Sequence, residues 1–366
     1  MATRDPWFDN VRWLAGSLVV VVHFTSSLIH NLEPGEVGTL ADWLHSALYP
    51  FRLPLFALLV GYFSHVEPNT KHYNNLLRTI IFPVAIISVL HILLLLWKTG
   101  EWQFDPVAAQ YTLWFMYGVV LWRVAAPYIA RLRFPVSLSI IFALASGMYA
   151  SLWVFGLYSV TGLTPFFVLG LMLRRNDAWL RVRTWWKTLI AVALIVAWFV
   201  GFTIFHFQGR VDRGLLGMTR SYDGDFAADN WHGMWIRFLL LLVTGLAMFA
   251  SLYLAPRRHL PIITYVGAGG FTIYLLHGLV IRIINFIEPS FLAQAEAWWE
   301  ILLQVAGGFA LALLLGSKPV RWLVRPIVRP KANWLLLPVG KSSSSERSAF
   351  EDSQAAGSTD ERPPKA

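Results

Sequence analysis

Runs of about 20 mostly apolar residues, separated by short polar segments, recur along the sequence. A helix of about 20 residues crosses the hydrocarbon layer, because each residue rises about 1.5 Å through a core about 30 Å thick. The pattern therefore predicts an all-α fold, a polytopic integral membrane helix bundle with ten spans. The predicted spans are 11–30, 43–63, 76–97, 111–130, 136–154, 158–173, 188–207, 233–254, 264–284 and 298–316.

Lysine and arginine gather in alternate connections between these spans. They are dense in 174–187 and after residue 316, and absent from 31–42; the long connection 208–232 breaks the alternation. Cytoplasmic connections of membrane proteins carry the excess of these residues, so both termini are predicted to be cytoplasmic, which agrees with an even number of spans. We expect residues 1–333 to form one transmembrane domain and 334–366, rich in serine and charge, a disordered cytoplasmic tail.

Composition supports a membrane protein. Hydrophobic residues make up 56% of the chain and charged residues 14%, whereas soluble proteins carry about 25% charged residues. The net charge of +9 is explained by cytoplasmic loops facing anionic lipid, so the bilayer is the expected partner and nucleic acid is not. The chain has no cysteine, which excludes thiolate chemistry, and no metal-ligand spacing appears. The expected location is the inner or plasma membrane.

Ionisable residues inside the predicted spans are few, and each costs at least about 2.5 kcal/mol to insert, so each is expected to have a task. Arg12 and His23 are separated by 11 residues, close to three helical turns, which places them on one face about 16 Å apart. An imidazole takes a proton from a hydroxyl near neutral pH, so His23 is the predicted catalytic residue. The alternative is a structural histidine bonded to Ser26 or Ser27.

Three further residues fall at a comparable depth. Arg52 is interpreted as a cation for a substrate oxygen or oxyanion, or as a side chain that reaches back to the outer headgroups. His277 lies at a similar depth in the ninth span, and His91 in the third, where packing is favoured for it. Trp114 begins the fourth span, where an aromatic side chain is by default an interface anchor.

Four segments, taken in order, resemble acyltransferase family 3, the membrane O-acyltransferases, in its fucose 4-O-acetylase-like branch. They are residues 5–12 followed by His23, residues 52–56 with 61–63, residues 113–117, and residues 274–277. The resemblance implies acetyl transfer from cytoplasmic acetyl-CoA to a hydroxyl of an extracytoplasmic envelope glycan or glycolipid. It implies no permanently bound cofactor.

The same resemblance implies roles for particular residues. His23 would be essential, acting either as a general base or as a transient acyl carrier, and Arg12 would help to hold the donor. Substrate-binding roles are expected for Arg12, Arg52, Trp114, Tyr274 and His277, and donor phosphate binding for Arg174 and Arg175.

Two alternatives stay open at this level. Tyr222 and Trp231 in the 208–232 connection suit a sugar, which stacks on aromatic rings, but an ordinary solvated loop has the same composition. A multi-span transporter or flippase would also share the spans and the buried charges.

Overall fold

The computed structural model describes residues 5–26, 36–67, 70–102, 111–149, 154–175, 180, 182–207, 216–218, 221–222, 230–293, 295, 297–328 and 330. Every regular element within these residues is helical, with no strand, so the all-α prediction is confirmed for this part of the chain. The predicted tail 334–366 and most of the 208–232 connection lie outside the described residues.

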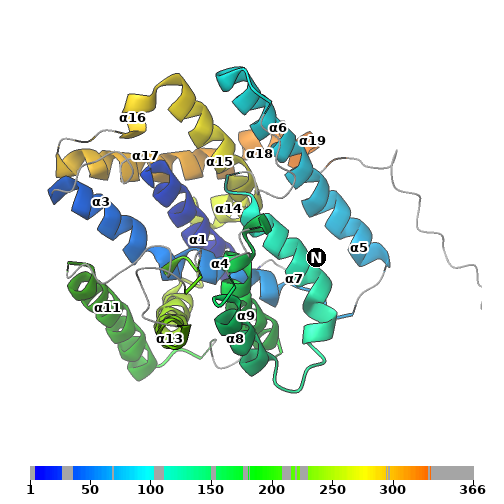
Figure 1. The fold of residues 1–366 in the computed structure, drawn as a ribbon, viewed down its shortest axis with the longest axis vertical. Coiled ribbons are helices and arrows are strands. Elements are labelled where there is room, and N and C mark those ends of the chain that lie inside the picture. The colour runs from blue at the N-terminus through cyan, green and yellow to red at the C-terminus, as the bar shows by residue number, and fades with distance from the viewer. Residues whose placement is uncertain are drawn as a thin grey trace, which may run out of the picture.

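Figure 1 shows how the described helices pack together. In order they are α1 (Pro6–Phe24), α3 (Glu36–Ala47), η1 (Tyr49–Phe51), α4 (Leu53–Tyr62), α5 (Thr70–Leu76), η2 (Leu77–Ile81), α6 (Phe82–Thr99), α7 (Trp114–Ile129), α8 (Pro135–Ser146), η3 (Val154–Gly156), α9 (Leu157–Leu173), α11 (Trp185–Phe207), α13 (Asn230–Leu254), α14 (Ile263–Gly267), α15 (Gly270–Ile287), α16 (Pro289–Ala293), α17 (Trp298–Gly316), α18 (Lys318–Leu323) and α19 (Arg325–Val328).

Six helices of the described chain are long and apolar enough to cross a membrane, or seven if the bent pair α3 and α4 counts as one span. The ten-span prediction is therefore not confirmed, and the cytoplasmic position of both termini stays a prediction. Helix α1 has 19 residues, but its first turns carry Asp9, Asn10 and Arg12; α7 and α8 have only 16 and 12 residues. The six are His72–Thr99, Val154–Leu173, Trp185–Phe207, Asn230–Leu254, Gly270–Ile287 and Trp298–Gly316.

Helix α1 lies inside the bundle. It contacts α4, α14, α15 and α17, and in Figure 1 these helices surround it. Val11, Ala15 and Val20 are completely buried, although they do not share one stripe of the helix. A helix that is apolar nearly all round is buried on all sides rather than at a surface. The helix that carries Arg12 and His23 is therefore held at the centre of the fold.

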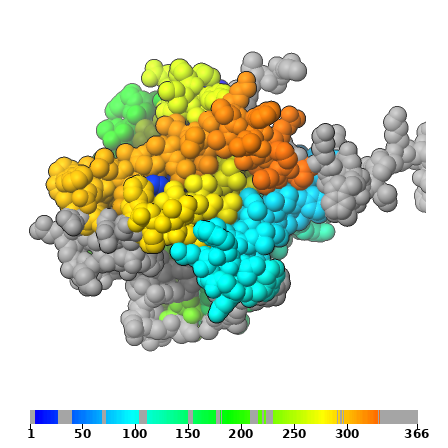
Figure 2. All heavy atoms as spheres, turned by 90° about the horizontal axis from the view of Figure 1, so that it is seen from above, coloured from blue at the N-terminus to red at the C-terminus, as the bar shows by residue number. Residues whose placement is uncertain are grey.

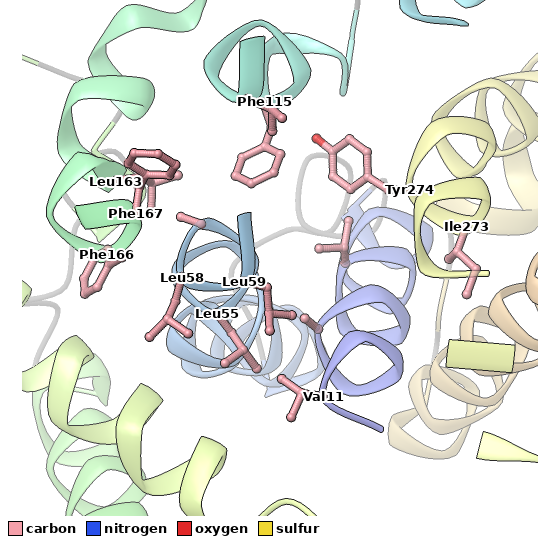
Figure 3. Close-up of a cluster of buried hydrophobic side chains, with 14 of the residues drawn as sticks. Val11, Leu55, Leu58, Leu59, Phe115, Leu163, Phe166, Phe167, Ile273 and Tyr274 are labelled. Atoms are coloured by element: carbon pink, nitrogen blue, oxygen red, sulfur yellow. The ribbon is translucent and has the colours of Figure 1, made fainter. Parts of the chain in front are cut away.

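The core beside α1 lies between α4 and α9. Figure 3 shows Leu55 and Leu58 of α4 and Phe166 and Phe167 of α9, with Phe115 of α7 above them. A Cβ atom added at Gly61 of α4 would overlap backbone atoms of α9. The two helices thus approach closely through a small residue, as helices in membranes commonly do.

The second predicted span is broken rather than continuous. Helix α3 and the following η1–α4 segment meet at a bend of 40°. Pro50 and Pro54 follow this bend and lie on either side of Arg52, where η1 gives way to α4; proline lacks the N–H that a continuous helix would need. Arg52 stands between η1 and α4 as the N-cap residue of α4, so the break fixes the position of a cation inside the bundle.

The late helices pack beside the third span. Helix α15 contacts both α6 and α17, and α19 contacts α6. Figure 2 shows this face, with α6 in cyan, α15 in yellow and α17 to α19 in orange lying side by side. Segments almost 200 residues apart in sequence, His91 and Arg282 among them, therefore meet across the face.

We predict that Gly61→Ala destabilises the folded bundle by about 1–3 kcal/mol, the usual cost of overpacking a close contact. The matched control is Gly201→Ala in α11, where an added Cβ meets nothing within 4 Å and where alanine favours the helix. Thermal unfolding of both variants in detergent, followed by tryptophan fluorescence, measures the difference. Equal melting temperatures for the two variants would show that α4 and α9 do not pack through Gly61.

Candidate functional site

His23 stands near the C-terminal end of α1 and is half-buried. Its imidazole faces two rings, with centroid distances of 5.3 Å to His277 and 5.9 Å to Tyr111. The Ser26 hydroxyl donates to the backbone carbonyl of His23 (2.8 Å). Ser27, the other partner expected for a structural histidine, lies outside the described residues, so the role of His23 stays a prediction.

His277 comes from α15 and is completely buried. Its Nδ1 lies 2.6 Å from the backbone carbonyl oxygen of Tyr274, one turn earlier in the helix, and its Nε2 has no partner. The Tyr274 hydroxyl donates to the Thr112 carbonyl at 2.6 Å. This bond ties α15 to the segment that leads into α7, so the His277 ring and its surroundings are fixed from two elements.

Arg52 is buried, with 8% of its surface exposed. Its guanidinium lies 5.5 Å from the centre of the Tyr49 ring, and its Nε makes no hydrogen bond. No carboxylate of the described chain pairs with it. The broken span therefore holds a buried cation that has no carboxylate partner among the described residues.

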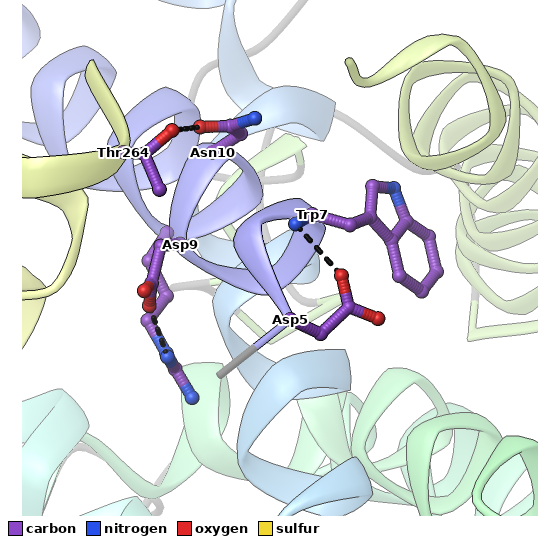
Figure 4. A network of polar contacts seen from close by, with 6 residues as sticks. Asp5, Trp7, Asp9, Asn10 and Thr264 are labelled. Atoms are coloured by element: carbon purple, nitrogen blue, oxygen red, sulfur yellow. Dashed lines mark hydrogen bonds and ion pairs between the residues drawn. The ribbon is translucent and has the colours of Figure 1, made fainter. Parts of the chain in front are cut away.

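Arg12 has a different environment. Its guanidinium forms an ion pair with Asp9 (2.7 Å) and lies 4.4 Å from the centre of the Phe63 ring. The Asp9 partner, visible in Figure 4, compensates much of its charge. Arg12 is therefore held in place at the opposite end of α1 from His23.

Asn10 anchors the same end of α1. Its amide donates to the carbonyls of Pro256 (2.8 Å) and Arg258 (3.0 Å), and its oxygen accepts from the Thr264 hydroxyl (2.6 Å). Figure 4 shows the Asn10–Thr264 contact beside Asp9. All the polar capacity of this buried amide is used to fasten α1 to the segment that joins α13 and α14.

A large cavity opens at the same end of the bundle as Arg12. Its volume is about 990 Å³, and α5, η2, α7, α14, α15, α18 and α19 contribute to its lining. Five lining residues are cations and none is acidic, and within the described chain none of the five forms an ion pair. The cations of this basic cavity are Arg78, Arg123, Lys318, Arg321 and Arg325.

A narrower cavity of about 160 Å³ leads inward from it. The two cavities share Ile80, Arg123 and Phe271. The narrow one reaches Tyr274, whose ring lies 5.3 Å from the His277 ring. Its wall is otherwise mostly apolar and includes Arg12, Phe56, Leu59, Val60, Phe63, Phe115, Met116, Val119 and Gly270.

The structure thus brings His23, His277 and Tyr274 together through ring contacts, and Arg12 and Tyr274 line the narrow cavity. His23, Arg52 and His277 line neither cavity. Trp114 does not line either cavity. It packs over Gly156 and meets the Phe115 ring edge-on.

The predicted donor-binding arginines lie elsewhere. Arg174 donates to the carbonyl of Ser64, and Arg175 to that of Ala130 at 3.1 Å; neither lines the basic cavity. Their role in phosphate binding stays a prediction. The sequence identifies the five cations of the basic cavity only as part of the excess of lysine and arginine predicted on the cytoplasmic side. It does not show that they line one cavity, because that depends on how the helices pack.

The structure also shows where Tyr222, Trp231 and His91 lie. Tyr222 is only 2% exposed, donates to the Leu144 carbonyl and covers Arg237 at 4.8 Å, so it packs inward and is not free to stack on a sugar. Trp231 is exposed. His91, for which packing was favoured, is buried and contacts Arg282 through its Nδ1 (3.4 Å). Among the described residues no cluster of three or more histidine or acidic side chains could hold a metal.

Comparison with known proteins gives a family for the chain. The acyltransferase family 3 model, described as an acyltransferase domain, matches residues 5–317. The inner membrane protein YcfT of Escherichia coli (strain K12) is 24% identical over 236 residues, in an alignment covering 54% of this chain and 66% of that protein. The chain thus spans just under two thirds of that relative. No solved structure matches the chain.

Proposed function

The chain belongs to acyltransferase family 3, and from that premise we propose that it transfers an acetyl group from acyl-CoA to a hydroxyl of an extracytoplasmic envelope glycan or glycolipid. The observation that carries the proposal is a basic cavity that shares lining residues with a narrow, mostly apolar one, which reaches Tyr274. The Tyr274 ring lies 5.3 Å from the His277 ring, which in turn faces His23 at 5.3 Å. A donor with an anionic head and a slim reactive arm fits such an arrangement.

The basic cavity would bind the phosphates of the donor. Five cations around one space, without a carboxylate among the lining residues, create a positive potential that concentrates a polyanion. Arginine forms charge-assisted, often bidentate hydrogen bonds with phosphate. Arg78 and Arg321 are half-buried with unpartnered Nε atoms, and their charge would be balanced by the donor rather than by the protein.

The narrow cavity would take the arm that carries the thioester. Its apolar wall, with rings from Phe56, Phe115 and Phe271, excludes water and leaves few polar groups for competing contacts. Figure 3 shows Phe115 and Tyr274 facing each other above α1 and α4. An arm entering past Arg12 would bring its thioester toward Tyr274 and the histidine pair.

Chemistry would occur at His23. A hydroxyl attacking a thioester needs a base for its proton and a cation or donor for the oxyanion that forms. His23 would act either as that base or as the atom that briefly carries the acyl group. Arg52, buried without a carboxylate partner among the described residues, would stabilise the oxyanion.

The acceptor would enter from the other side of the bilayer, and the protein would reside in the inner or plasma membrane. His23 lies about 16 Å along α1 from Arg12, so a donor held at the basic cavity and an acceptor from the opposite side can meet at His23 without either one crossing the membrane. We therefore propose that the acyl group alone crosses.

We predict that Arg321→Gln raises KM for acetyl-CoA about 10-fold or more with little change in kcat, because a hydrogen bond to a charged group contributes about 1.5–3 kcal/mol. The comparison substrate is acetyl-pantetheine, which lacks the nucleotide and its phosphates and should show an unchanged KM. The control is Arg131→Gln, an exposed cation that does not line the cavity. An unchanged KM for acetyl-CoA in Arg321→Gln would remove the basic cavity from donor binding, as expected if it holds a lipid headgroup instead.

We predict that His23→Ala lowers acetyl transfer about 100-fold or more, the minimum typical of a lost proton-transfer group. Labelled acetyl-CoA is supplied to protein in vesicles containing envelope glycolipid, and label in the glycolipid is counted. Membrane insertion of the variant should match that of the wild-type chain. Wild-type transfer by His23→Ala would exclude His23 from the reaction, and movement of unmodified glycolipid without labelling would favour a flippase.

We predict that Arg52→Ala lowers kcat about 100-fold, the usual cost of losing one group that stabilises an oxyanion, while KM for acetyl-CoA changes little. The control is Lys98→Ala, which removes an exposed cation that donates to the Phe286 carbonyl. Both variants are assayed in the same vesicles. A wild-type kcat in Arg52→Ala would exclude the guanidinium from stabilising the oxyanion.

A further inference from the structure

The proton position on His277 follows from its hydrogen bond. Its Nδ1 lies 2.6 Å from the Tyr274 carbonyl oxygen, and a carbonyl oxygen only accepts, so Nδ1 must carry the proton. A neutral imidazole has one ring proton, which leaves a lone pair on Nε2. The helix α15 therefore fixes not only the orientation of the ring but also its tautomer, with the accepting nitrogen on the far edge.

That accepting nitrogen has no partner. His277 is completely buried and its Nε2 makes no hydrogen bond, an arrangement that is unfavourable unless a ligand completes it. The Thr112 hydroxyl beside α15 is also buried without a partner, and its oxygen crowds the space next to Gly278. Two orphaned polar groups from different elements thus flank the same region.

The facing group is the imidazole of His23. The two rings are 5.3 Å apart and tilted by 38°, yet neither donates to the other. His277 holds the Tyr274 carbonyl oxygen against its N–H, and a carbonyl dipole stabilises an imidazolium. Of the two rings, His277 is the better placed to carry a positive charge.

We propose that Nε2 of His277 accepts the proton of the acceptor hydroxyl during acyl transfer, an inference that rests on the proposed function. The hydroxyl O–H bond breaks and an N–H bond forms at Nε2, while the oxygen forms a bond to the acyl carbon. The bond from that carbon to the sulfur of CoA breaks, and its electron pair leaves with the sulfur. The thiolate takes up one proton as the imidazolium releases one. His23 is then left to orient the acyl group.

The test compares two acceptors with His277→Asn. The asparagine amide keeps a donor near the Nδ1 position for the Tyr274 carbonyl but has no acceptor at the Nε2 position. With envelope glycolipid as acceptor, kcat should fall about 100-fold or more, with KM for acetyl-CoA unchanged. With hydroxylamine, a nucleophile that attacks without losing a proton first, the rate of acetohydroxamate formation should stay within about threefold of the wild-type rate.

The control is His91→Asn, which removes another completely buried imidazole with an unpartnered Nε2 that does not face His23. It should retain transfer to both acceptors. Equal loss with glycolipid and hydroxylamine in His277→Asn would overturn the inference, since a packing or binding role slows both, and so would wild-type transfer to glycolipid. If the wild-type chain acetylates neither acceptor, the proposed function itself fails and the inference falls with it.

Discussion

The close packing of α1 is the constraint on which the other features depend. A Cβ at Gly267 of α14 would overlap the Asp9 carbonyl, and one at Gly308 of α17 would lie 2.8 Å from the Cα of Val21. Small residues thus let two helices touch the backbone of α1 near each of its ends. Asn10 adds three hydrogen bonds at one end. Because α1 is fixed at both ends, Arg12 and His23 stay at fixed depths in the bundle. If α1 could shift along its axis, neither residue would keep its position for acyl transfer across the membrane.

The second principle of the molecule is the placement of positive charge. Burying a cation costs free energy unless an opposite charge or hydrogen bonds compensate it. The cations of this protein differ in whether they have such a partner. Arg12 has Asp9 as an internal partner, so its charge is balanced without a ligand. Arg52 and the cations of the basic cavity have no carboxylate partner among the described residues. A cation that the protein leaves without a carboxylate partner is suited to bind a negatively charged group of a substrate.

The sequence predicts the helical fold and several residues of the candidate site. It does not predict features that depend on how the helices pack. Periodicity and the cost of buried charge identify the all-α fold and single out His23, Arg52 and His277, which the structure places near one another. Pro50 and Pro54 in the sequence indicate an interrupted helix near Arg52. The direction of the chain at the interruption depends on the helices around it. The basic cavity is not predictable, because its cations come from segments far apart in the chain. Tyr222 illustrates a different failure of sequence reasoning. An aromatic residue in a polar connection is expected to be exposed, but here its ring covers Arg237.

A membrane acyltransferase must let an acyl group pass while water and protons do not, and the histidine pair suits that demand. A single imidazole that both oriented the acyl group and accepted the hydroxyl proton would have to use its two ring nitrogens, which point in different directions, for the two tasks. Two rings 5.3 Å apart divide the tasks, and the tautomer of the second is set by a backbone carbonyl rather than by solvent. The proton released at the reaction centre then stays on a buried nitrogen until the products separate, so no water-filled path is needed at the moment when the acyl bond is most reactive.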